Sequence, residues 1–294
     1  MTMLAKSPQS AAFFAGRVAV IATMHHKERA IAPSLESALG VKTRVPPEFN
    51  TDSFGTFTRD VKRPTDQLNT ARLKAAAALA ATGETLAIAS EGSFGPHPQI
   101  PFVPCDRELV LLLDRQHQFE IVGEALSTDT NHRAKTVHTV QEALDFAQTV
   151  GFPTHGVVVM RAANDCPPET IFKGITTEAR LTEAVTLTLA QSPVKTAHIE
   201  TDMRALYNPT RMKVIAKATQ DLIRAIEHQC PNCDCPGFSI IRHNPGLPCE
   251  LCGLPTLLTL SVSYHCQRCQ FQQTKRFPDS RPVADPADCP YCNP

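Results

Sequence analysis

The first 228 residues alternate between short apolar runs and segments whose apolar residues recur at helical spacing. The apolar runs predict strands at 17–22, 41–45, 85–89, 156–161 and 197–201, and a hairpin formed by 108–113 and 119–126. Helical spacing predicts helices at 28–39, from Thr65 or Asp66 to about Ala81, at 140–150, at 177–190, and from Pro209 to about His228. Because strands and helices alternate, we expect an α/β domain at residues 17–228, built on a mixed, partly parallel sheet with helices on both faces.

The pattern changes in the last part of the chain. Residues 229–294 are rich in Pro and Gly and contain three short strand-like runs, at 238–242, 257–264 and 271–277. A segment of this size is too small to bury an adequate apolar core unaided. We expect a separate small domain here, and a flexible N-terminal segment at residues 1–16.

Four Cys-x-x-Cys pairs account for the stability of this small domain. They are Cys230/Cys233, Cys249/Cys252, Cys266/Cys269 and Cys289/Cys292. A gap of two residues lets both sulfurs of a tight turn point at one ion, so this spacing predicts a double zinc ribbon with two structural zinc sites, each held by four cysteines. Disulfides are the alternative. Residues 1–16 lack the continuous apolar core of a secretion signal, and thiols inside the cell stay reduced, which favours zinc.

The run between the second and third pairs bears on which pairs share an ion. Residues 257–264 contain no turn residue, and eight extended residues cover roughly 26 Å, so Cys252 and Cys266 are expected at opposite ends of a strand. The Pro- and Gly-containing loops at 243–246 and 278–286 can each return the chain. We therefore predict sequential pairing, the first pair with the second and the third with the fourth, and leave a nested pairing as the alternative. Cys235 and His265 are interpreted as spare neighbours of the ligands.

The charge balance and the length of the apolar runs indicate which partners the protein can bind. Lys and Arg number 29 and so do Asp and Glu, and no cluster provides the basic footprint that nucleic-acid binding requires. No apolar run approaches the ~20 residues needed to cross a bilayer. We expect a cytoplasmic protein that does not bind membranes; no sequence feature specifies its oligomeric state. Cys105 and Cys166, which stand alone among apolar and Pro residues, are interpreted as packing residues.

Two predicted loops carry polar residues that packing does not require. The first follows the first strand at 22–28, where Thr23, Lys27 and a free helix N-terminus suit an anion such as phosphate. The second, at 90–98, places Glu91 beside two glycines, which suits a metal ion, with Ser90 and Ser93 as substrate contacts. The alternatives are a capped helix start with a solvated lysine, and a tight turn with a solvated glutamate.

A third polar set follows two later strands. Asp129 lies in the segment 127–131, and Asp202, Arg204 and Arg211 lie in the segment 200–211. These acids and arginines suit a metal and an anionic substrate. Alternatively, Asp202 pairs with Arg204 or Arg211 as part of the scaffold, and Asn208 caps the last helix.

Several strings carry a resemblance over nearly the whole chain. These strings, ATMHHKERAIAPSLESALG, SEGSFGPHP, ETDMRALYNPTRM and CPYCNP, are similar to a bacterial family, common in cyanobacteria, defined as a domain of unknown function with a zinc-ribbon-like tail. That resemblance implies no activity.

Residues 17–131 distantly resemble the inosine/xanthosine triphosphate pyrophosphatases. Ala22-Thr23 and Lys27 match that family's first loop, although its Asn is missing and the loop is one residue shorter. The run 70–75, Thr-Ala-Arg-Leu-Lys-Ala, is similar to its Asn-Ala-x-x-Lys-Ala helix, and Ser90-Glu91-Gly92-Ser93 is similar to its metal loop, with one acid in place of two. The resemblance implies a Mg²⁺-dependent nucleotide pyrophosphohydrolase.

Two functional hypotheses follow. The first is a metal-dependent hydrolase of a nucleotide or another phosphorylated small molecule, with Glu91, Lys27 and Asp202 as catalytic residues, Thr23, Ser90, Ser93, Arg204 and Arg211 as substrate contacts, and two structural zinc ions in the tail. The second is a non-catalytic binding or adaptor protein that uses the zinc ribbon to dock a protein or nucleic-acid partner.

Overall fold

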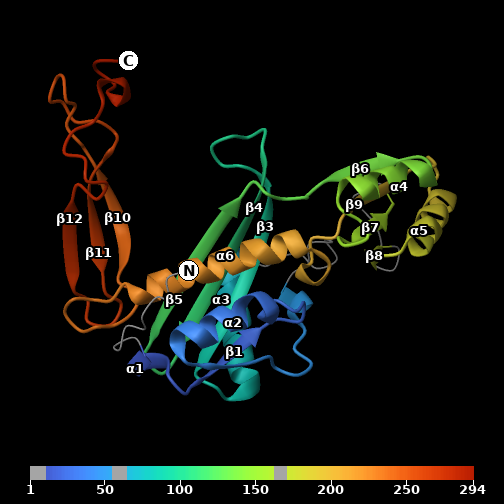
Figure 1. Ribbon diagram of the computed structural model, residues 1–294, viewed down its shortest axis with the longest axis horizontal. Coiled ribbons are helices and arrows are strands. Elements are labelled where there is room, and N and C mark those ends of the chain that lie inside the picture. The colour runs from blue at the N-terminus through green and yellow to red at the C-terminus, as the bar shows by residue number, and fades with distance from the viewer. Residues whose placement is uncertain (1–10, 55–64, 162–170) are drawn as a thin grey trace.

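A computed structural model describes residues 11–54, 65–161 and 171–294. Figure 1 shows three β-sheets arranged in a row, with the central one flanked by a smaller α/β unit at one end and by the cysteine-rich ribbon at the other. The N-terminal helix α1 (Ala11–Phe14) packs against the central part, and Phe14 is fully buried. Residues 11–16 therefore belong to the fold instead of to a flexible terminus, and residues 1–10 lie outside the described ranges.

The central sheet has five strands in the order β2-β1-β3-β4-β5. The strands are β1 (Val18–Ala22), β2 (Lys42–Arg44), β3 (Leu86–Pro96), β4 (Pro104–Asp114) and β5 (Phe119–Ser127). Strand β1 runs parallel to β2 and β3, while β3, β4 and β5 form an antiparallel meander. The prediction of a mixed, partly parallel sheet is confirmed.

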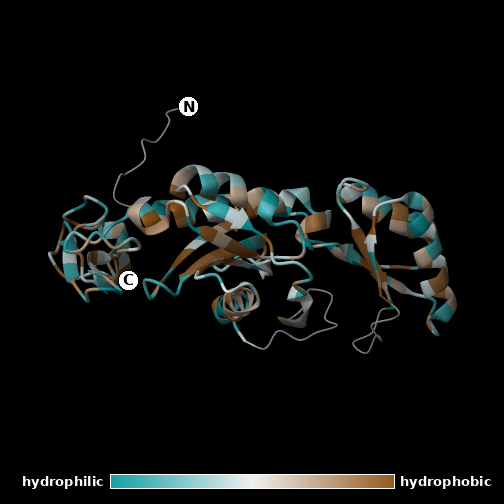
Figure 2. Cartoon of the chain, turned by 90° about the horizontal axis from the view of Figure 1, so that it is seen from below, coloured by the Kyte–Doolittle hydropathy of each residue, from teal (hydrophilic) through white to brown (hydrophobic). Residues whose placement is uncertain are grey.

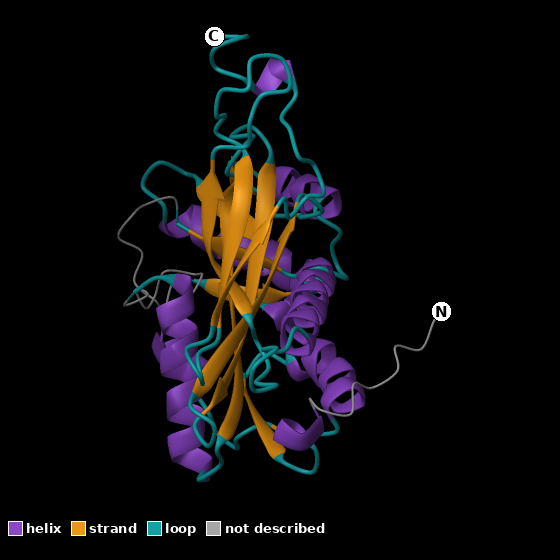
Figure 3. Cartoon of the chain, turned by 90° about the vertical axis from the view of Figure 1, so that its left-hand side faces the viewer, coloured by secondary structure: helices purple, strands orange, loops and turns teal. Residues whose placement is uncertain are grey.

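Helices cover both faces of this sheet, as the alternating pattern predicted (Figure 3). On one face, α2 (Glu28–Leu39) and α6 (Pro209–Glu227) pack on the even-numbered residues of β3 and β4. On the other face, the alanine-rich α3 (Gln67–Thr82) packs on the odd-numbered residues. Figure 2 shows the hydrophobic strands between these layers, so the core is a sheet buried on both sides.

The local boundaries follow the expected chemistry. Helix α3 begins at Asp66, whose carboxylate accepts a hydrogen bond from the Asn69 N–H at 2.8 Å. Both α2 and α3 end at a glycine in the left-handed conformation, Gly40 and Gly83. The short 3-10 turn η1 (Thr51–Phe54) follows β2.

A second sheet of four antiparallel strands has the order β6-β9-β7-β8. It contains β6 (Ala134–Val137), β7 (Val157–Met160), β8 (Phe172–Ile175) and β9 (Ala197–Thr201), with α4 (Val140–Thr149) and α5 (Glu178–Gln191) packed on it. The apolar pattern predicted β7, β9 and both helices but missed β6 and β8. Three of the four residues of β6 are exposed, so no apolar run marks that strand.

The C-terminal ribbon is a three-stranded antiparallel sheet in the order β10-β11-β12. Its strands are β10 (Ser239–Pro245), β11 (Thr259–His265) and β12 (Gln272–Arg276), and the 3-10 turn η4 (Pro286–Asp288) lies near the C-terminus. Helix α6, preceded by η3 (Ala205–Tyr207), runs along the central sheet and leads directly into the ribbon (Figure 1). None of the helices that the structure describes combines the length and apolar character needed to span a bilayer.

Candidate functional site

The strand order creates a switch point between β1 and β3. The connection from β1 leads through α2 to β2 on one side, and the connection from β2 leads through α3 to β3 on the other side, with the two helices on opposite faces. In open α/β sheets, ligands bind outside the carboxyl ends of strands at such a point. Strand β1 ends at Ala22, while β3 continues to Pro96, so the later residues of β3 extend beyond the end of β1.

Six charged side chains are buried around this point, each less than 10% exposed. They are Lys27, Lys74, Glu91, Asp106, Glu108 and Arg211, and together they are called the charge cluster below. Removing charges from water costs several kcal/mol per ion unless partners compensate for the loss. Three acids and three bases meet here, so part of the compensation comes from within the cluster.

Lys27 occupies the centre of the charge cluster, at the N-terminus of α2. Its Nζ donates a hydrogen bond to the carbonyl oxygen of Ser90 on β3 at 2.9 Å. Burial is the largest cause, and the nearby Arg211 guanidinium the second, of a lowering of the pKa of Lys27 to about 7. The carboxylates of Glu108 and Glu91 act in the other direction and only partly offset this shift. The side chain therefore changes its charge near neutral pH.

Glu91 lies on the α3 face of the sheet, where Lys74 of α3 meets it. The Lys74 Nζ and the Glu91 Oε1 are 2.5 Å apart, and both side chains are less than 10% exposed. The segment 90–96, predicted as a glycine-rich loop, is in fact part of β3 and pairs with β4 throughout. The loop prediction was wrong because β3 extends beyond its apolar residues, and only the pairing with β4 specifies that extension.

Glu108 and Arg211 form a fully buried ion pair on the opposite face. The Arg211 Nε donates to the Glu108 Oε1 at 2.6 Å, its Nη1 donates to the Met203 carbonyl oxygen at 2.6 Å, and its guanidinium lies over the Phe94 ring. A β-carbon at Gly92 would come within 2.3 Å of the Glu108 Oε1, so the glycine makes room for the pair.

Asp106 lies two residues before Glu108 on β4, so both carboxyl groups point to the same face. Asp106 is 1% exposed, and its Oδ1 has no hydrogen-bond partner among the described residues. Burial and the neighbouring Glu108 carboxylate raise the pKa of Asp106 to about 8. Asp106 therefore keeps its proton at neutral pH.

The raised pKa of Asp106 predicts a pH-dependent change in stability. Between about pH 4 and pH 8 the unfolded chain loses this proton while the native protein retains it. The free energy of unfolding therefore falls by at most about 1.4 kcal/mol per pH unit over that window, and it levels off above it. We expect the Asp106→Asn variant to gain stability relative to the wild type as the pH rises through the window, as measured by urea denaturation at each pH. A difference that stays constant with pH would contradict this assignment.

Lys27 has the opposite effect from Asp106 on how stability changes with pH. Above about pH 7 the native protein releases a proton that the unfolded chain keeps up to about pH 10.5, so the contribution of Lys27 to stability rises with pH over that range. The Asp106→Asn comparison isolates the acid because Lys27 is present in both proteins.

The structure brings some of the predicted site residues together and separates others. Lys27, Ser90, Glu91 and Arg211 all belong to the charge cluster or touch it. Thr23 is buried in the loop before α2, where its Oγ1 accepts a hydrogen bond from the His25 N–H.

The remaining predicted residues lie elsewhere. The Asp202 carboxylate binds Arg204 at 2.7 Å and the Gly174 N–H at 3.0 Å, so it is directed toward β8 of the second sheet. That pairing matches the scaffold alternative, and no contact between described residues joins the Asp202 carboxylate to Lys27 or Glu91. Ser93 lies on β3 opposite Arg107, and Asp129 is exposed after β5. Asn208 caps α6, as expected.

Sequence reasoning missed Lys74, Asp106 and Glu108 as members of the charge cluster. Lys74 lies on the buried face of α3 among Ala71, Ala75 and Ala78. A charged residue in register with a buried helical stripe is a detectable pattern. Asp106 and Glu108 likewise alternate in register with the buried Val110 and Leu112, so the period of β4 already placed two acids on the core face.

The eight cysteines form two groups of four, each of which can hold a metal ion. Cys230, Cys233, Cys266 and Cys269 form the base centre, next to the central domain, and Cys249, Cys252, Cys289 and Cys292 form the tip centre, at the far end of the ribbon. Sulfur–sulfur distances of 3.7 to 3.9 Å link partners within each group. Four sulfurs at 2.3 Å from a tetrahedral zinc lie about 3.8 Å apart, so both groups match two structural zinc sites.

The predicted sequential pairing is wrong, and so is the nested alternative. The first Cys-x-x-Cys pair joins the third, and the second joins the fourth. Each of the three strands carries the chain from one end of the ribbon to the other, so successive pairs alternate between the ends. The error arose at 243–246, interpreted as a returning turn, whereas β10 continues through Pro245. Cys235 and His265 lie outside both groups, and the buried Cys105 is a packing residue; Cys166 lies outside the described ranges.

The comparisons with known proteins bear on this architecture. No curated protein and no solved structure matches the chain. A family model described as a domain of unknown function, DUF6671, matches residues 74–294. The match includes all eight cysteine ligands and every member of the charge cluster except Lys27. The chain therefore belongs to the DUF6671 family.

Proposed function

We propose that this protein is a metal-dependent hydrolase of a nucleotide or another phosphorylated small molecule, with the charge cluster as its site. The observation that carries the proposal is the burial of six charged side chains at the switch point between β1 and β3. Perturbed pKa values gather at functional sites, because burial and charged neighbours are arranged there to suit a reaction. Lys27 and Asp106 are both perturbed.

Lys27 serves as the phosphate-binding cation in this proposal. It lies at the N-terminus of α2, where the positive end of the helix dipole also favours an anion. An incoming phosphate stabilises the ammonium form, so substrate binding raises the pKa of Lys27 from about 7 and leads to proton uptake. The positive charge is thus present when substrate is bound and partly removed when the site is empty.

Glu91 is the residue that would hold a magnesium ion. Its carboxylate supplies the hard oxygen that Mg²⁺ prefers, and Mg²⁺ in such sites is held by one or two carboxylates together with the substrate phosphates. The Lys74 Nζ, 2.5 Å from the Glu91 Oε1, holds that side chain in position. When bound, a magnesium ion would neutralise negative charge on the phosphate oxygens.

Asp106 is the proton donor in this proposal. Because its pKa is about 8, it carries a proton at neutral pH. Glu108 lies beside it and is held by Arg211, so the protonated carboxyl and the fixed carboxylate have different roles on the same strand. A carboxyl that retains its proton near the working pH suits general-acid catalysis.

The test is an assay of the full chain against a panel of nucleoside triphosphates and sugar phosphates, with and without Mg²⁺. Release of phosphate or pyrophosphate is followed by ³¹P NMR. We expect Mg²⁺-dependent turnover that falls about 100-fold or more in the Glu91→Gln variant. The matched control is Glu124→Gln, which changes an exposed glutamate of β5 and should leave turnover unchanged. Full turnover by Glu91→Gln would remove Glu91 from the mechanism, and no turnover on any substrate would defeat the hydrolase proposal.

A second candidate function is docking of a partner by the ribbon. The observation that favours it is a group of exposed apolar side chains at the end of the ribbon farthest from the central domain. A rigid, metal-held module that presents such side chains is suited to binding another macromolecule. This role is compatible with catalysis in the central domain, because the two surfaces are separate.

A further inference from the structure

The ribbon separates its charges along its length. Strands β10, β11 and β12 carry Arg242, Lys275 and Arg276 and no acidic residue. The connecting segments at the far end, residues 246–258 and 277–294, are called the tip. The tip carries four acidic residues against one basic residue, Arg281; the four are Glu250, Asp279, Asp285 and Asp288. The charge balance of the sequence as a whole conceals this separation.

The metal centre makes the tip more negative. Four cysteine thiolates around one Zn²⁺ leave a net charge of about −2 at such a site. The tip centre, with Cys252 and Cys292 exposed, lies within this acidic surface. With zinc bound, the tip would carry a concentrated negative charge at the end of the molecule.

The same short segments contain an unusual share of exposed apolar surface. Six of the seventeen large hydrophobic residues exposed in the described parts of the chain belong to the tip. They are Leu251, Leu254, Leu257, Leu258, Val283 and Tyr291, with Leu257 84% and Leu251 74% exposed. Apolar groups gathered in one place and surrounded by charged residues mark interaction sites.

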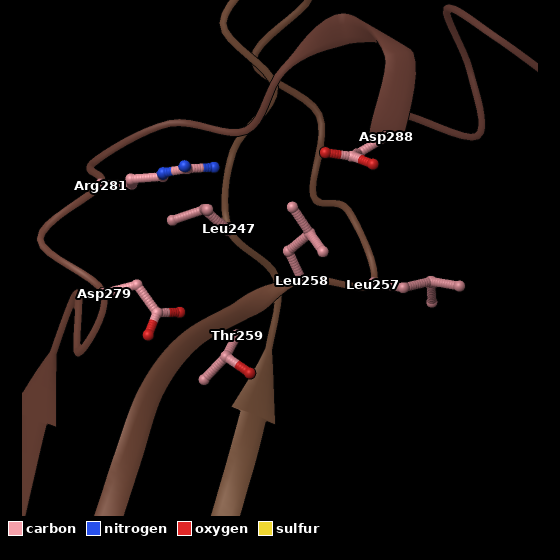
Figure 4. Close-up of a pocket in the computed structure, with 7 residues that line it drawn as sticks. All are labelled: Leu247, Leu257, Leu258, Thr259, Asp279, Arg281 and Asp288. Atoms are coloured by element: carbon pink, nitrogen blue, oxygen red, sulfur yellow. The ribbon is translucent and has the colours of Figure 1, made fainter. Parts of the chain in front are cut away.

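A cavity of about 490 Å³ lies at the tip. Figure 4 shows Asp279 and Arg281 reaching it from the segment after β12, Asp288 reaching it from η4, and Leu247 and Leu258 between them. No described residue forms a hydrogen bond or ion pair with the side chains of Asp279 and Asp288. The volume falls in the range of ligand clefts, roughly 300–1,000 Å³.

From these features we infer that the tip binds a basic, leucine- or aromatic-containing segment of a partner protein. Lysine or arginine side chains of the segment place their stems on Leu247 and Leu258 and their charged ends at Asp279 and Asp288. Its apolar residues cover Leu251 and Leu257. The basic strands β10 to β12 repel the same segment, so charge directs it to the tip.

The inference rests on the docking role named above and is independent of the hydrolase proposal. A random 16-residue peptide library, displayed on phage, is selected on the full zinc-loaded chain and counter-selected on the Asp279→Asn/Asp288→Asn variant. We expect the enriched peptides to carry more Lys and Arg than Asp and Glu, together with Leu or aromatic residues. The affinity of a synthetic copy should fall tenfold or more in the double variant and in Leu257→Ala, as measured by fluorescence anisotropy.

The matched control is Glu183→Gln/Leu187→Ala, which changes an exposed acid and an exposed leucine one turn apart on α5 and should leave affinity unchanged. Two zinc ions per chain by native mass spectrometry confirm that each variant keeps its ribbon. Enriched peptides that are neutral or acidic would overturn the partner class while leaving docking in place. Failure to enrich any peptide that depends on the tip would overturn docking itself. Neither result affects the hydrolase proposal, which the turnover assay tests separately.

Discussion

Replacing Cys266 with serine is expected to disrupt the base of the ribbon and to destabilise the central domain. Cys266 and Cys230 are at most 2% exposed and belong to the same apolar cluster as Ile121, Phe119 and helix α6. Structural zinc contributes about 10–16 kcal/mol of binding free energy in small zinc domains at neutral pH, so loss of the base centre removes a large share of the ribbon's stability. The measurements are zinc content by native mass spectrometry and urea denaturation followed by circular dichroism.

The tip centre provides the matched comparison. Cys252 is exposed and belongs to none of the apolar clusters. The Cys252→Ser variant should also bind one zinc ion instead of two, yet it should leave the unfolding of the central domain unchanged within about 0.5 kcal/mol. Equal losses of central-domain stability in the two variants would show that the base centre is not coupled to the core.

The Arg211→Met substitution should cost about 3–5 kcal/mol of unfolding free energy, because it leaves the fully buried Glu108 carboxylate without its cation. The Met203 carbonyl oxygen also loses its donor. A double variant, Arg211→Met with Glu108→Met, removes both charges at similar volume and should recover most of that loss. Urea denaturation near neutral pH, extrapolated linearly to zero denaturant, measures both effects.

An exposed ion pair is the control for Arg211. Arg107 and Glu124 are 3.0 Å apart, with side chains 50% and 46% exposed. Arg107→Met should therefore change stability by less than about 1 kcal/mol. If Arg211→Met lowers the free energy of unfolding no more than Arg107→Met does, then Arg211 does not compensate the buried charge of Glu108.

Local patterns predicted many elements of residues 17–228 well. The helices at 28–39 and 140–150, the strand at 197–201 and the caps at Asp66 and Asn208 all follow from periodicity and side-chain chemistry close along the chain. The cysteine spacing likewise identified two tetracysteine groups. For these helices and caps the determining interactions lie within a few residues, whereas the cysteine spacing specified the pairs and not which pairs combine.

Features that depend on distant partners were harder to predict. Strand β6 is mostly exposed and forms only because β9, more than fifty residues later, pairs with it. The same holds for the charge cluster, whose six members come from five separate elements. Which cysteine pairs share a metal ion depends on whether residues 243–246 form a turn or continue β10. The pairing of β10 with β11 determines that the strand continues.

The interleaved arrangement of the two metal centres has a consequence for biosynthesis. The base centre is complete once residue 269 has left the ribosome, whereas the tip centre waits for residue 292. In the interval, Cys249 and Cys252 have already emerged with no partners. A nascent chain that is interrupted after β12 and before residue 289 contains all four cysteines of the base centre and only two of the tip centre, so we expect it to bind one metal ion.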